Sequence, residues 1–465
     1  MFPSLTITSW VTLHGLVTAV AVLCYVIASH VLQQRRHPTA AIAWILFILL
    51  VPYVALPAFL TFGSRKQARP GSITVPSSAP VDTSESWAIQ TIRALGQPAP
   101  EAYHDLNIHQ DGREALNALW QTIDGAQHSI ELCTFILASD RLGAAVIDRL
   151  CAKARAGVRV RLLLDGMGNL MAGRPKLRRL TQAGATVTLF VPPLHSPLKG
   201  RTNLRNHRKM LIADASHKTC RLWCGGRNLA SEYFDGMSGK PPWHDLSFDL
   251  CGPFVQQASA LFAHDWAFAS AYKTVVEAPG VPGAHGSDCG AQLVASGPDQ
   301  VDDTVYALLV TAAYRAHRRI ALVTPYFVPD ASLLMAMCLA ARRGVVVDLF
   351  LPAQSNHRLS DIARGRALRA LALAGGRIWL APHMLHAKLA IIDDTLALAG
   401  STNLDSRSLF LNYELMVAFH DVSDVERFAA WFDRERVSAK PYTASRPGLL
   451  RDLAEGMVLW VGFQL

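Results

Sequence analysis

The sequence predicts an α/β protein made of two similar halves, preceded by two membrane-spanning helices. Three observations predict this fold class. Two long N-terminal runs carry no charged residue. The rest of the chain alternates short β-rich runs with helical stretches, which is typical of α/β folds. One polar motif, H-x-K-x-x-x-x-D, occurs twice. A chain of 465 residues has room for two or three domains.

The N-terminus predicts a helical hairpin in the bilayer. Residues 10–32 and 39–63 contain no Asp, Glu, Lys or Arg, and each run is as long as the ~20 apolar residues that a membrane helix needs. A short polar turn, 33–38, separates them, and Pro52 and Pro57 should kink the second helix. A cleaved signal peptide fits less well, because no basic segment precedes the first run and a second run follows at once.

Charge and composition agree with a membrane protein. Charged residues make up 17% of the chain, against about 25% in soluble domains. The net charge of +9 indicates a polyanionic partner, either acidic lipid or nucleic acid. The eight cysteines are scattered, and Cys220 and Cys224 have no second pair nearby. Since no other metal-ligand spacing is present, the sequence predicts neither a metal nor a cofactor.

We expect four segments: an anchor at 1–66, a linker at 67–100 rich in Pro, Ser, Gly and Ala, a first half at 101–275 and a second half at 276–465. Basic residues flank the second apolar run, and two arginines lie between the runs. The positive-inside rule slightly favours a cytoplasmic catalytic part. The expected location is therefore the cell (inner) membrane, with more than one span.

Within the two halves, the chain repeats one order of helices and strands. In the first half we expect elements at 114–124, 129–135, 144–157, 158–165, 176–184 and 186–190, and in the second at 301–316, 319–323, 333–344, 345–351, 363–375 and 377–380. Each pass ends in a motif-bearing strand and a glycine turn. This order predicts an α/β sandwich with a buried mixed or parallel sheet. Pseudo-symmetry would then bring the two motifs face to face.

The motif residues suit phosphoryl chemistry. They are His207, Lys209 and Asp214 in the first half and His386, Lys388 and Asp393 in the second. On a strand, His and Lys two residues apart project on the same face. Imidazole can act as nucleophile or as acid and base near neutral pH, and a lysine beside it can hold phosphoryl oxygens.

Two positions in each repeat leave alternatives open. Asp214 and Asp393 each follow their histidine by seven residues, an odd offset that points away from the histidine face. A structural role is therefore at least as plausible for them as a catalytic one. Asn228 and Asn403 end the glycine turns, where an amide can orient phosphate.

The double motif resembles the phospholipase D superfamily, in which two such half-sites form one phosphodiester-transfer centre. The similarity to bacterial cardiolipin synthases extends over nearly the whole chain. It rests on stretches such as 225–233, 243–245, 262–266, 296–299, 324–330, 403–408 and 412–414. The chain departs from that family at 56–59 and 354–357, which leaves headgroup preference more open than catalysis.

The resemblance implies two phospholipase D-like halves and transfer of a phosphatidyl group between two phosphatidylglycerol molecules, giving cardiolipin and glycerol. It implies no nucleotide and no metal, because the lysines and asparagines supply the positive field. We expect His207 to be the nucleophile and His386 the acid and base, although the symmetry permits the reverse. Glu414 would hold His386 and Glu232 would hold His207, unless these carboxylates face solvent.

Three other readings remain. A phospholipase D-type hydrolase or headgroup-exchange enzyme would use the same site. A membrane-tethered nuclease is disfavoured, because nuclease relatives carry one motif per chain and no aromatic and basic platform for nucleic acid is visible. A lipid-binding protein with a decayed site is disfavoured by the complete motifs. The arginines at 364, 366 and 369 could meet anionic headgroups or simply face solvent.

Overall fold

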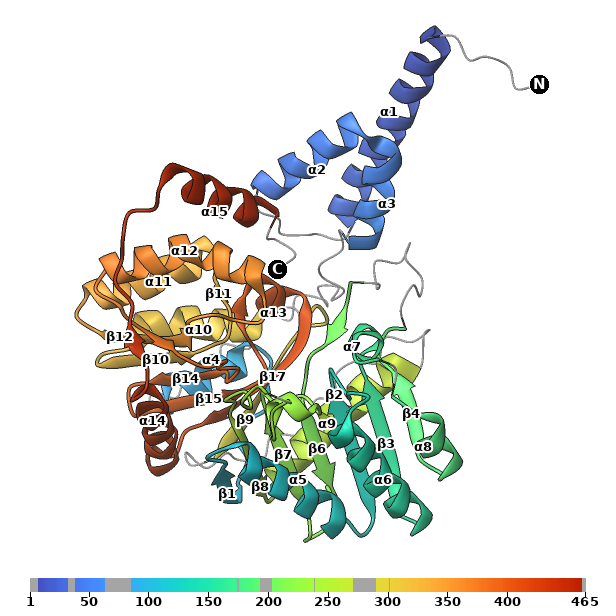
Figure 1. Ribbon diagram of the computed structural model, residues 1–465, viewed down its shortest axis with the longest axis vertical. Helices are drawn as coiled ribbons and strands as arrows, with labels where there is room; N and C mark the ends of the chain where they lie inside the picture. Colours follow the sequence, from blue (N-terminus) through green and yellow to red (C-terminus); the bar gives the residue numbers. More distant parts are fainter. Residues whose placement is uncertain are drawn as a thin grey trace.

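A computed structural model shows two α/β lobes with a helical projection at one end (Figure 1). The structure describes residues 7–31, 38–62, 85–173, 175–192, 203–237, 239–270, 290–300 and 302–461. Residues 33–37 of the predicted turn and 67–84 of the predicted linker lie outside the described residues.

Three apolar helices form the projection: α1 (Ile7–Val31), α2 (Pro38–Leu50) and α3 (Pro52–Phe62). Within the described residues, one helix is long and apolar enough to cross a membrane, by its segment Trp10–Ile27. The second apolar run is broken before Pro52, because proline has no N–H to continue the helix and clashes with the preceding turn. The predicted single kinked helix is therefore two shorter helices.

The first lobe contains a sheet of seven strands among the described residues, in the order β1-β8-β7-β6-β2-β3-β4. The strands are β1 (His104–Ile108), β2 (Ser129–Thr134), β3 (Arg159–Leu164), β4 (Thr186–Leu189), β6 (Met210–Ala213), β7 (Arg221–Gly225) and β8 (Ser247–Cys251). The helices are α5 (Gly112–Gly125), α6 (Arg141–Arg155), α7 (Gly166–Met171), α8 (Arg178–Gln182) and α9 (Phe254–Ser270), with a 3₁₀ turn at Ser231–Tyr233.

The second lobe repeats this order as β9-β17-β15-β14-β10-β12-β13. Its strands are β9 (Ala291–Ser296), β10 (Arg319–Val323), β12 (Val346–Pro352), β13 (Arg377–Ala381), β14 (Leu389–Ile392), β15 (Leu396–Gly400) and β17 (Asn412–Phe419), with β18 (Lys440–Pro441) at the edge. A separate pair is β11 (Phe327–Val328) with β16 (Leu404–Asp405). The helices are α10 (Thr304–Arg315), α11 (Ala331–Arg342), α12 (Arg358–Leu373), α13 (Ser406–Phe410), α14 (Val422–Arg436) and α15 (Leu449–Val461).

Strand direction is repeated as well as strand order. In each lobe the motif strand, β6 or β14, runs antiparallel to its two neighbours, and the three strands at 129–189 or 319–381 are parallel. The predicted mixed α/β sheets with internal repetition are therefore present. Parallel strands need helical crossovers, which is why helices and strands alternate along the chain.

One apolar core joins the lobes. Phe248 and Phe254 of the first lobe and Phe419 and Phe428 of the second belong to a single buried cluster. Because both lobes contribute to this core, their relative position is set by close packing.

Residues 85–100 differ from the predicted linker. They hold helix α4 (Trp87–Ala94), whose Ala88 and Ile92 are buried in the second-lobe core beside Val294 and Val305. The Pro- and Gly-containing composition of the longer stretch obscured this short amphipathic helix.

Short segments also cross between the lobes. Strand β5 (Arg205–Asn206) precedes the first motif but pairs with β17 of the second lobe. In return, His244 of the first lobe bridges to Leu385 beside the second motif. Each motif is therefore attached to the opposite half of the protein.

Candidate active site

His207 lies between β5 and β6 and is oriented by the second lobe. Its backbone N–H donates to the carbonyl of Tyr413 at 2.9 Å. Its Nδ1 lies 2.9 Å from Oε1 and 3.0 Å from Oε2 of Glu414, which is fully buried. When Nδ1 donates to this carboxylate, Nε2 keeps the lone pair that a nucleophile needs.

His386 is oriented by the first lobe in the same way. Its backbone N–H donates to the carbonyl of His244 at 2.6 Å, and its Nδ1 lies 2.7 Å from Oδ2 of Asp245. The rings of Tyr233 and Trp243 contact the imidazole, at centroid distances of 5.1 and 5.7 Å. This histidine is therefore held by a buried carboxylate and enclosed by aromatic walls.

This crossed arrangement corrects the expected pairing. Glu414 was expected to hold His386, but it holds His207. Glu232 was expected to hold His207. It lies in the 3₁₀ turn, and its pKa is raised by partial burial and by Asp140. Sequence proximity suggested that each carboxylate serves its own half, whereas the strand exchange at β5 and at His244 connects the halves.

Glu414 belongs to a buried hydrogen-bond network. Its carboxylate accepts from the hydroxyl of Ser401 at 2.5 Å, from the hydroxyl of Ser408 and from the amide of Asn412 at 3.3 Å. The first lobe has Gly226 where the second has Ser401. A Cβ at Gly226 would lie 2.2 Å from Oδ1 of Asp245. Glycine is therefore needed there for the carboxylate to fit.

The two motif lysines are almost completely buried. Nζ of Lys209 donates to the carbonyl of His207 at 2.5 Å, and Nζ of Lys388 lies 2.7 Å from Nδ1 and 3.1 Å from Nε2 of His386. Burial lowers the pKa of Lys209 to about 8 and that of Lys388 to about 7, although the acidic neighbours oppose this shift. A bound anion would restore the charged form.

Both histidines are held as neutral imidazoles. Burial lowers the pKa of His207, with a smaller contribution from Lys209 and Lys388, and this outweighs the opposing effect of Glu414. Burial and Lys388 lower the pKa of His386 to about 3. Each lysine acts on both histidines, so the four basic groups share one electrostatic environment.

The carboxylates remain ionised. Burial alone would raise the pKa of Asp245, but His386 and Lys388 bring it below its usual range. The pKa of Glu414 is also lowered, because His207 and Lys209 outweigh burial. A neutral imidazole beside an ionised carboxylate is the arrangement that activates nucleophiles and bases.

Arg208, the residue between the motif His and Lys, connects the lobes. Its side chain is fully buried and pairs with Asp265 of α9. It also donates to the backbone carbonyls of Glu414 at 3.0 Å and Ser296 at 3.3 Å. Sequence reasoning missed this role, because nothing local marks its distant partners.

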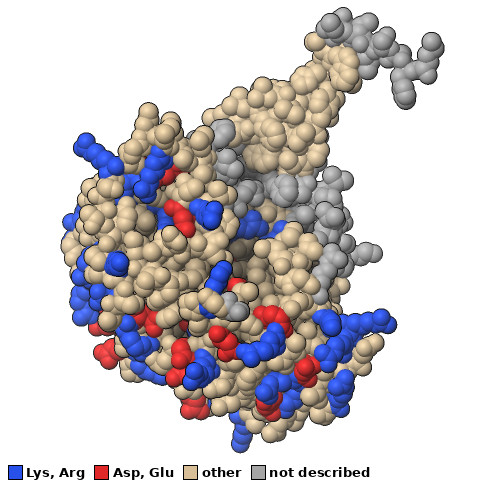
Figure 2. All heavy atoms as spheres, in the orientation of Figure 1, with Lys and Arg blue, Asp and Glu red and all other residues tan. Residues whose placement is uncertain are grey.

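Two more arginines that sequence reasoning missed bring positive charge between the lobes. Arg205 lies in β5, and Arg407 in α13 donates to the carbonyl of Asn203 at 3.2 Å. Burial and the neighbouring Arg205 lower the pKa of Arg407. Figure 2 shows Lys or Arg atoms within a hollow between the lobes, toward the helical projection. An anionic substrate would relieve such repulsion between like charges.

The motif aspartates have a structural position. Asp214 accepts backbone hydrogen bonds from residues 127, 128 and 129, at 2.7–2.8 Å. Asp393 accepts from residues 317, 318 and 319, at 2.8–2.9 Å. Both have a positive φ, 51° and 52°. They cap the start of β2 and β10, and these contacts favour the structural alternative over a catalytic role.

We therefore expect Asp214→Asn and Asp393→Asn to lower stability rather than turnover. Each change leaves backbone donors at a strand start poorly paired, which should cost about 2–3 kcal/mol, while asparagine tolerates the positive φ. Thermal unfolding should show a reduced Tm, and the folded protein at low temperature should keep its kcat within about threefold. A large loss of kcat in fully folded protein would return these residues to the chemistry.

The two turn asparagines differ. The amide of Asn228 is used inside the protein, since Nδ2 donates to the Tyr233 hydroxyl at 2.8 Å and Oδ1 accepts from the Ile136 N–H at 3.3 Å. The side-chain oxygen of Asn403 is buried and has no hydrogen-bond partner among the described residues. Phosphate contact therefore remains a prediction better suited to Asn403.

Asp245 is the functional residue that sequence reasoning should have found. It lies two residues before β8, which follows the first glycine turn, and Glu414 is the third residue of β17, which follows the second turn; leucine comes directly after each. Aligning the two sequence repeats at Asp245-Leu246 and Glu414-Leu415 would have indicated one carboxylate in each half.

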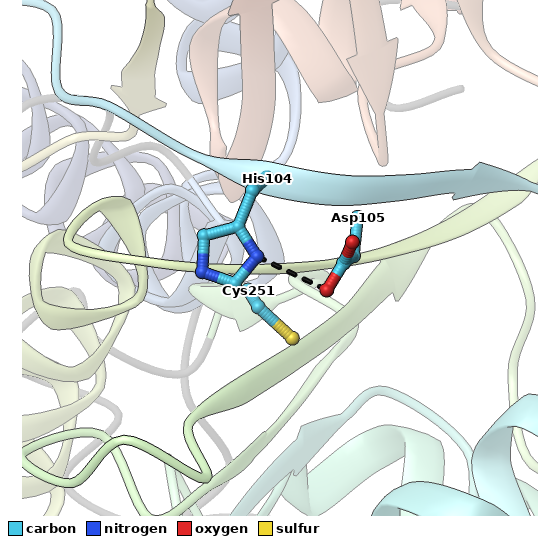
Figure 3. Close-up of side chains that lie close together, drawn as sticks. All are labelled: His104, Asp105 and Cys251. Carbon is cyan, nitrogen blue, oxygen red and sulfur yellow. Dashed lines mark hydrogen bonds and ion pairs between the residues drawn. The ribbon is translucent and has the colours of Figure 1, made fainter.

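Two side-chain clusters among the described residues could hold a metal ion. His104, Asp105 and Cys251 lie together at the edge of the first sheet, with Nδ1 of the histidine 3.1 Å from Oδ2 of the aspartate (Figure 3). The second cluster is His244, His383 and Glu435. Neither cluster contains a motif residue, and His244 of the second cluster is the residue whose backbone carbonyl accepts the N–H of His386.

Comparison with known proteins agrees with the geometry. A family model described as "Cardiolipin synthase, PLD-like domain" matches residues 119–266 and 309–436, and a "Phospholipase_D-nuclease N-terminal" model matches 19–64. Cardiolipin synthase A of Shigella flexneri is 30% identical over 442 residues, covering 88% of this chain and 90% of that protein. Cardiolipin synthase 1 of Bacillus cereus is 28% identical over 452 residues, covering 90% and 88%.

A solved structure shows a related fold. Phosphatidylserine synthase of Haemophilus influenzae Rd KW20 superposes with a TM-score of 0.61 at 12% identity, covering 81% of this chain and all of that one. The first family model spans both lobes and both motifs. With the repeated sheets and the paired half-sites, these matches show that the chain belongs to the cardiolipin synthase family with PLD-like domains.

Proposed function

We propose that this protein is a cardiolipin synthase that transfers a phosphatidyl group from one phosphatidylglycerol to another. The observation that carries the proposal is the single site in which two neutral histidines, each held by a carboxylate of the opposite lobe, lie with two buried lysines. Family membership and relatives named cardiolipin synthase over about 90% of the chain support it.

The geometry supports a two-step transfer. In the first step Nε2 of His207 attacks the donor phosphorus, the bond from phosphorus to the glycerol oxygen breaks, and His386 delivers a proton to that oxygen. Lys388 lies in hydrogen-bond range of the His386 ring and can supply this proton. In the second step His386 takes the proton of the acceptor hydroxyl, whose oxygen displaces His207.

The site also favours a lipid alcohol over water. His386, Lys209, Lys388, Asp245 and Glu414 are all at most 4% exposed. A site that excludes bulk water strengthens its electrostatic interactions and limits hydrolysis. Both steps exchange one phosphodiester or phosphoramidate bond for another, so no nucleotide is consumed.

Product analysis tests the function. The purified protein is added to phosphatidylglycerol vesicles, and the lipids are followed by thin-layer chromatography. We expect cardiolipin and an equal amount of free glycerol. Phosphatidic acid as the main product would make the protein a hydrolase. Turnover only after phosphatidylethanolamine is added would change the donor.

The pH dependence follows from the buried groups. His207 must be neutral to attack, so kcat/KM falls on the acid side below pH 6.5, because its pKa is lowered. Lys388 must be charged to bind phosphate and loses its proton as the pH rises through about 7. We therefore expect a narrow bell-shaped profile.

Lys388→Arg should lower kcat, because arginine cannot supply the proton to His386, and should move the alkaline limb upward, because arginine stays charged. The alkaline limb should then reflect the deprotonation of Lys209, whose pKa is about 8. Initial rates on a short-chain phosphatidylglycerol at constant ionic strength provide the measurement. An alkaline limb that does not move would mean that another group controls it.

We also propose that α1–α3 form a two-pass anchor with the catalytic lobes on the cytoplasmic side. The support is the cluster of Ala21, Tyr25, Ile48, Ala55 and Phe59, in which α1 packs against the other two helices. Cysteines placed at Gln34 and at Gln67 should label from opposite sides of the membrane with an impermeant maleimide. Labelling of both from the same side would exclude the hairpin.

A further inference from the structure

The C-terminal helix α15 has its apolar face turned outward. At 100° per residue, Leu449, Leu450, Leu453 and Met457 lie within an arc of about 100°. Their exposed fractions are 75%, 84%, 53% and 65%. Helices on soluble proteins normally turn such a stripe toward the core, so α15 has the reverse orientation.

The polar side of α15 is attached to α12. Arg369 makes two hydrogen bonds with Glu455, at 3.1 and 2.5 Å, and Glu455 is only 1% exposed. Arg366 donates to the carboxylate of Asp452 at 3.2 Å. A Cβ at Gly365 would lie 2.4 Å from the Glu455 carboxylate. The contact therefore depends on matched charges and on a glycine.

These ion pairs change the interpretation of the α12 arginines. Arg366 and Arg369 hold α15, and Arg364 donates to the backbone carbonyls of Pro352 and Ala353, at 2.9 and 2.7 Å. The contacts of all three arginines are with protein groups, so they do not support direct binding of lipid headgroups. Arg366 and Arg369 instead hold α15 so that its apolar face points outward.

The position of α15 identifies what covers that face. Along the longest axis of the molecule, α15 lies toward the same end as α1–α3, whereas α14 lies farther from that end (Figure 1). Helix α1 also exposes apolar side chains, including Trp10 at 54% and Val11 at 67%. Arg451 of α15 has a side chain that is 66% exposed. A helix with an exposed apolar stripe and an exposed basic side chain is typical of helices at a membrane surface.

We infer that α15 is an interfacial helix whose apolar face enters the bilayer. Together with the N-terminal anchor it would hold the catalytic lobes against the membrane at two points. The hollow between the lobes would then stay at the depth of the lipid headgroups, where both lipid substrates carry their phosphates. This consequence rests on the proposed function, whereas lipid contact itself can be measured without turnover.

The first measurement uses the full-length protein in vesicles that contain a phospholipid with a photoactivatable diazirine in its acyl chain. After illumination, peptide mass spectrometry should find lipid adducts on residues 449–457. Val437, which follows α14 and is 85% exposed, serves as an equally exposed apolar control and should carry none. Labelling of α1 without labelling of α15 would overturn the inference.

The second measurement uses the double variant Leu450→Glu/Leu453→Glu, with Val437→Glu as matched control. The double variant should lose the α15 adducts and raise the apparent KM for vesicle lipid roughly tenfold or more. Its kcat/KM on a water-soluble short-chain phosphatidylglycerol should equal that of the control. An equal loss on both substrates would mean that the helix is structural and would overturn the inference. Adducts on α15 without any turnover of phosphatidylglycerol would contradict the proposed function alone.

Discussion

Replacing His207 with alanine is expected to lower cardiolipin formation by roughly 10⁴-fold or more, and His386→Ala should do the same for a different reason. The first variant loses the atom that attacks phosphorus. The second keeps that atom but cannot protonate the glycerol oxygen or activate the acceptor hydroxyl. With phosphatidylglycerol alone the two losses would look alike.

An activated donor separates the two roles. With a phosphatidyl nitrophenol, the leaving group needs no proton. His386→Ala should then release one equivalent of nitrophenolate in a burst and leave a phosphatidyl group on His207. His207→Ala should give no burst. Stopped-flow absorbance records the burst, and intact-protein mass spectrometry records the adduct.

The opposite pattern would reverse the assignment of nucleophile and acid. The symmetry of the two lobes allows that result, and the adduct would then be found on His386. A burst in neither variant would exclude a covalent phospho-histidine intermediate at this site. Circular dichroism and retained vesicle binding control for loss of folding.

The second large effect is expected at the two carboxylates. Asp245→Asn and Glu414→Gln should each lower kcat by about 10²- to 10⁴-fold, because an amide no longer orients or stabilises the charged imidazole. The change in KM should be small, since neither carboxylate faces the lipid. Each substitution should impair the histidine of the opposite lobe.

The activated donor tests the crossing. Asp245→Asn acts on His386 and should keep the nitrophenolate burst, whereas Glu414→Gln acts on His207 and should slow it in proportion to its loss of kcat. Asp249→Asn is the matched control. Asp249 is 2% exposed and pairs with His109 at 2.8 Å outside the site. Its substitution should lower stability without changing the burst. If Glu414→Gln kept the burst and Asp245→Asn lost it, the assigned roles of the two histidines would be reversed.

Much of this architecture follows from local sequence. The periodicity of apolar residues in a strand or helix reflects which face of the element is buried, so it can be recognised from residues close together in the sequence. The repeated order of elements therefore predicted two equivalent sheets, and the H-x-K spacing predicted a His and a Lys together in each half. The odd offset of Asp214 and Asp393 also indicated that they point away from the histidines, where they cap strand starts.

Break points and short packed segments were harder to predict. The second apolar run was expected to be one kinked helix, but Pro52 ends α2 and begins α3. Helix α4 was hidden in a stretch with linker-like composition, because eight residues carry too little periodicity to stand out.

The sequence by itself determined the two half-sites, their residue types and the repeated sheets that carry them. Only the tertiary structure decided which carboxylate serves which histidine. Strand β5 crosses to pair with β17 and brings His207 to Glu414, while the segment at His244 crosses back and brings Asp245 to His386. Such contacts join residues 141 and 207 positions apart. They depend on how two buried surfaces pack together, which no local periodicity encodes.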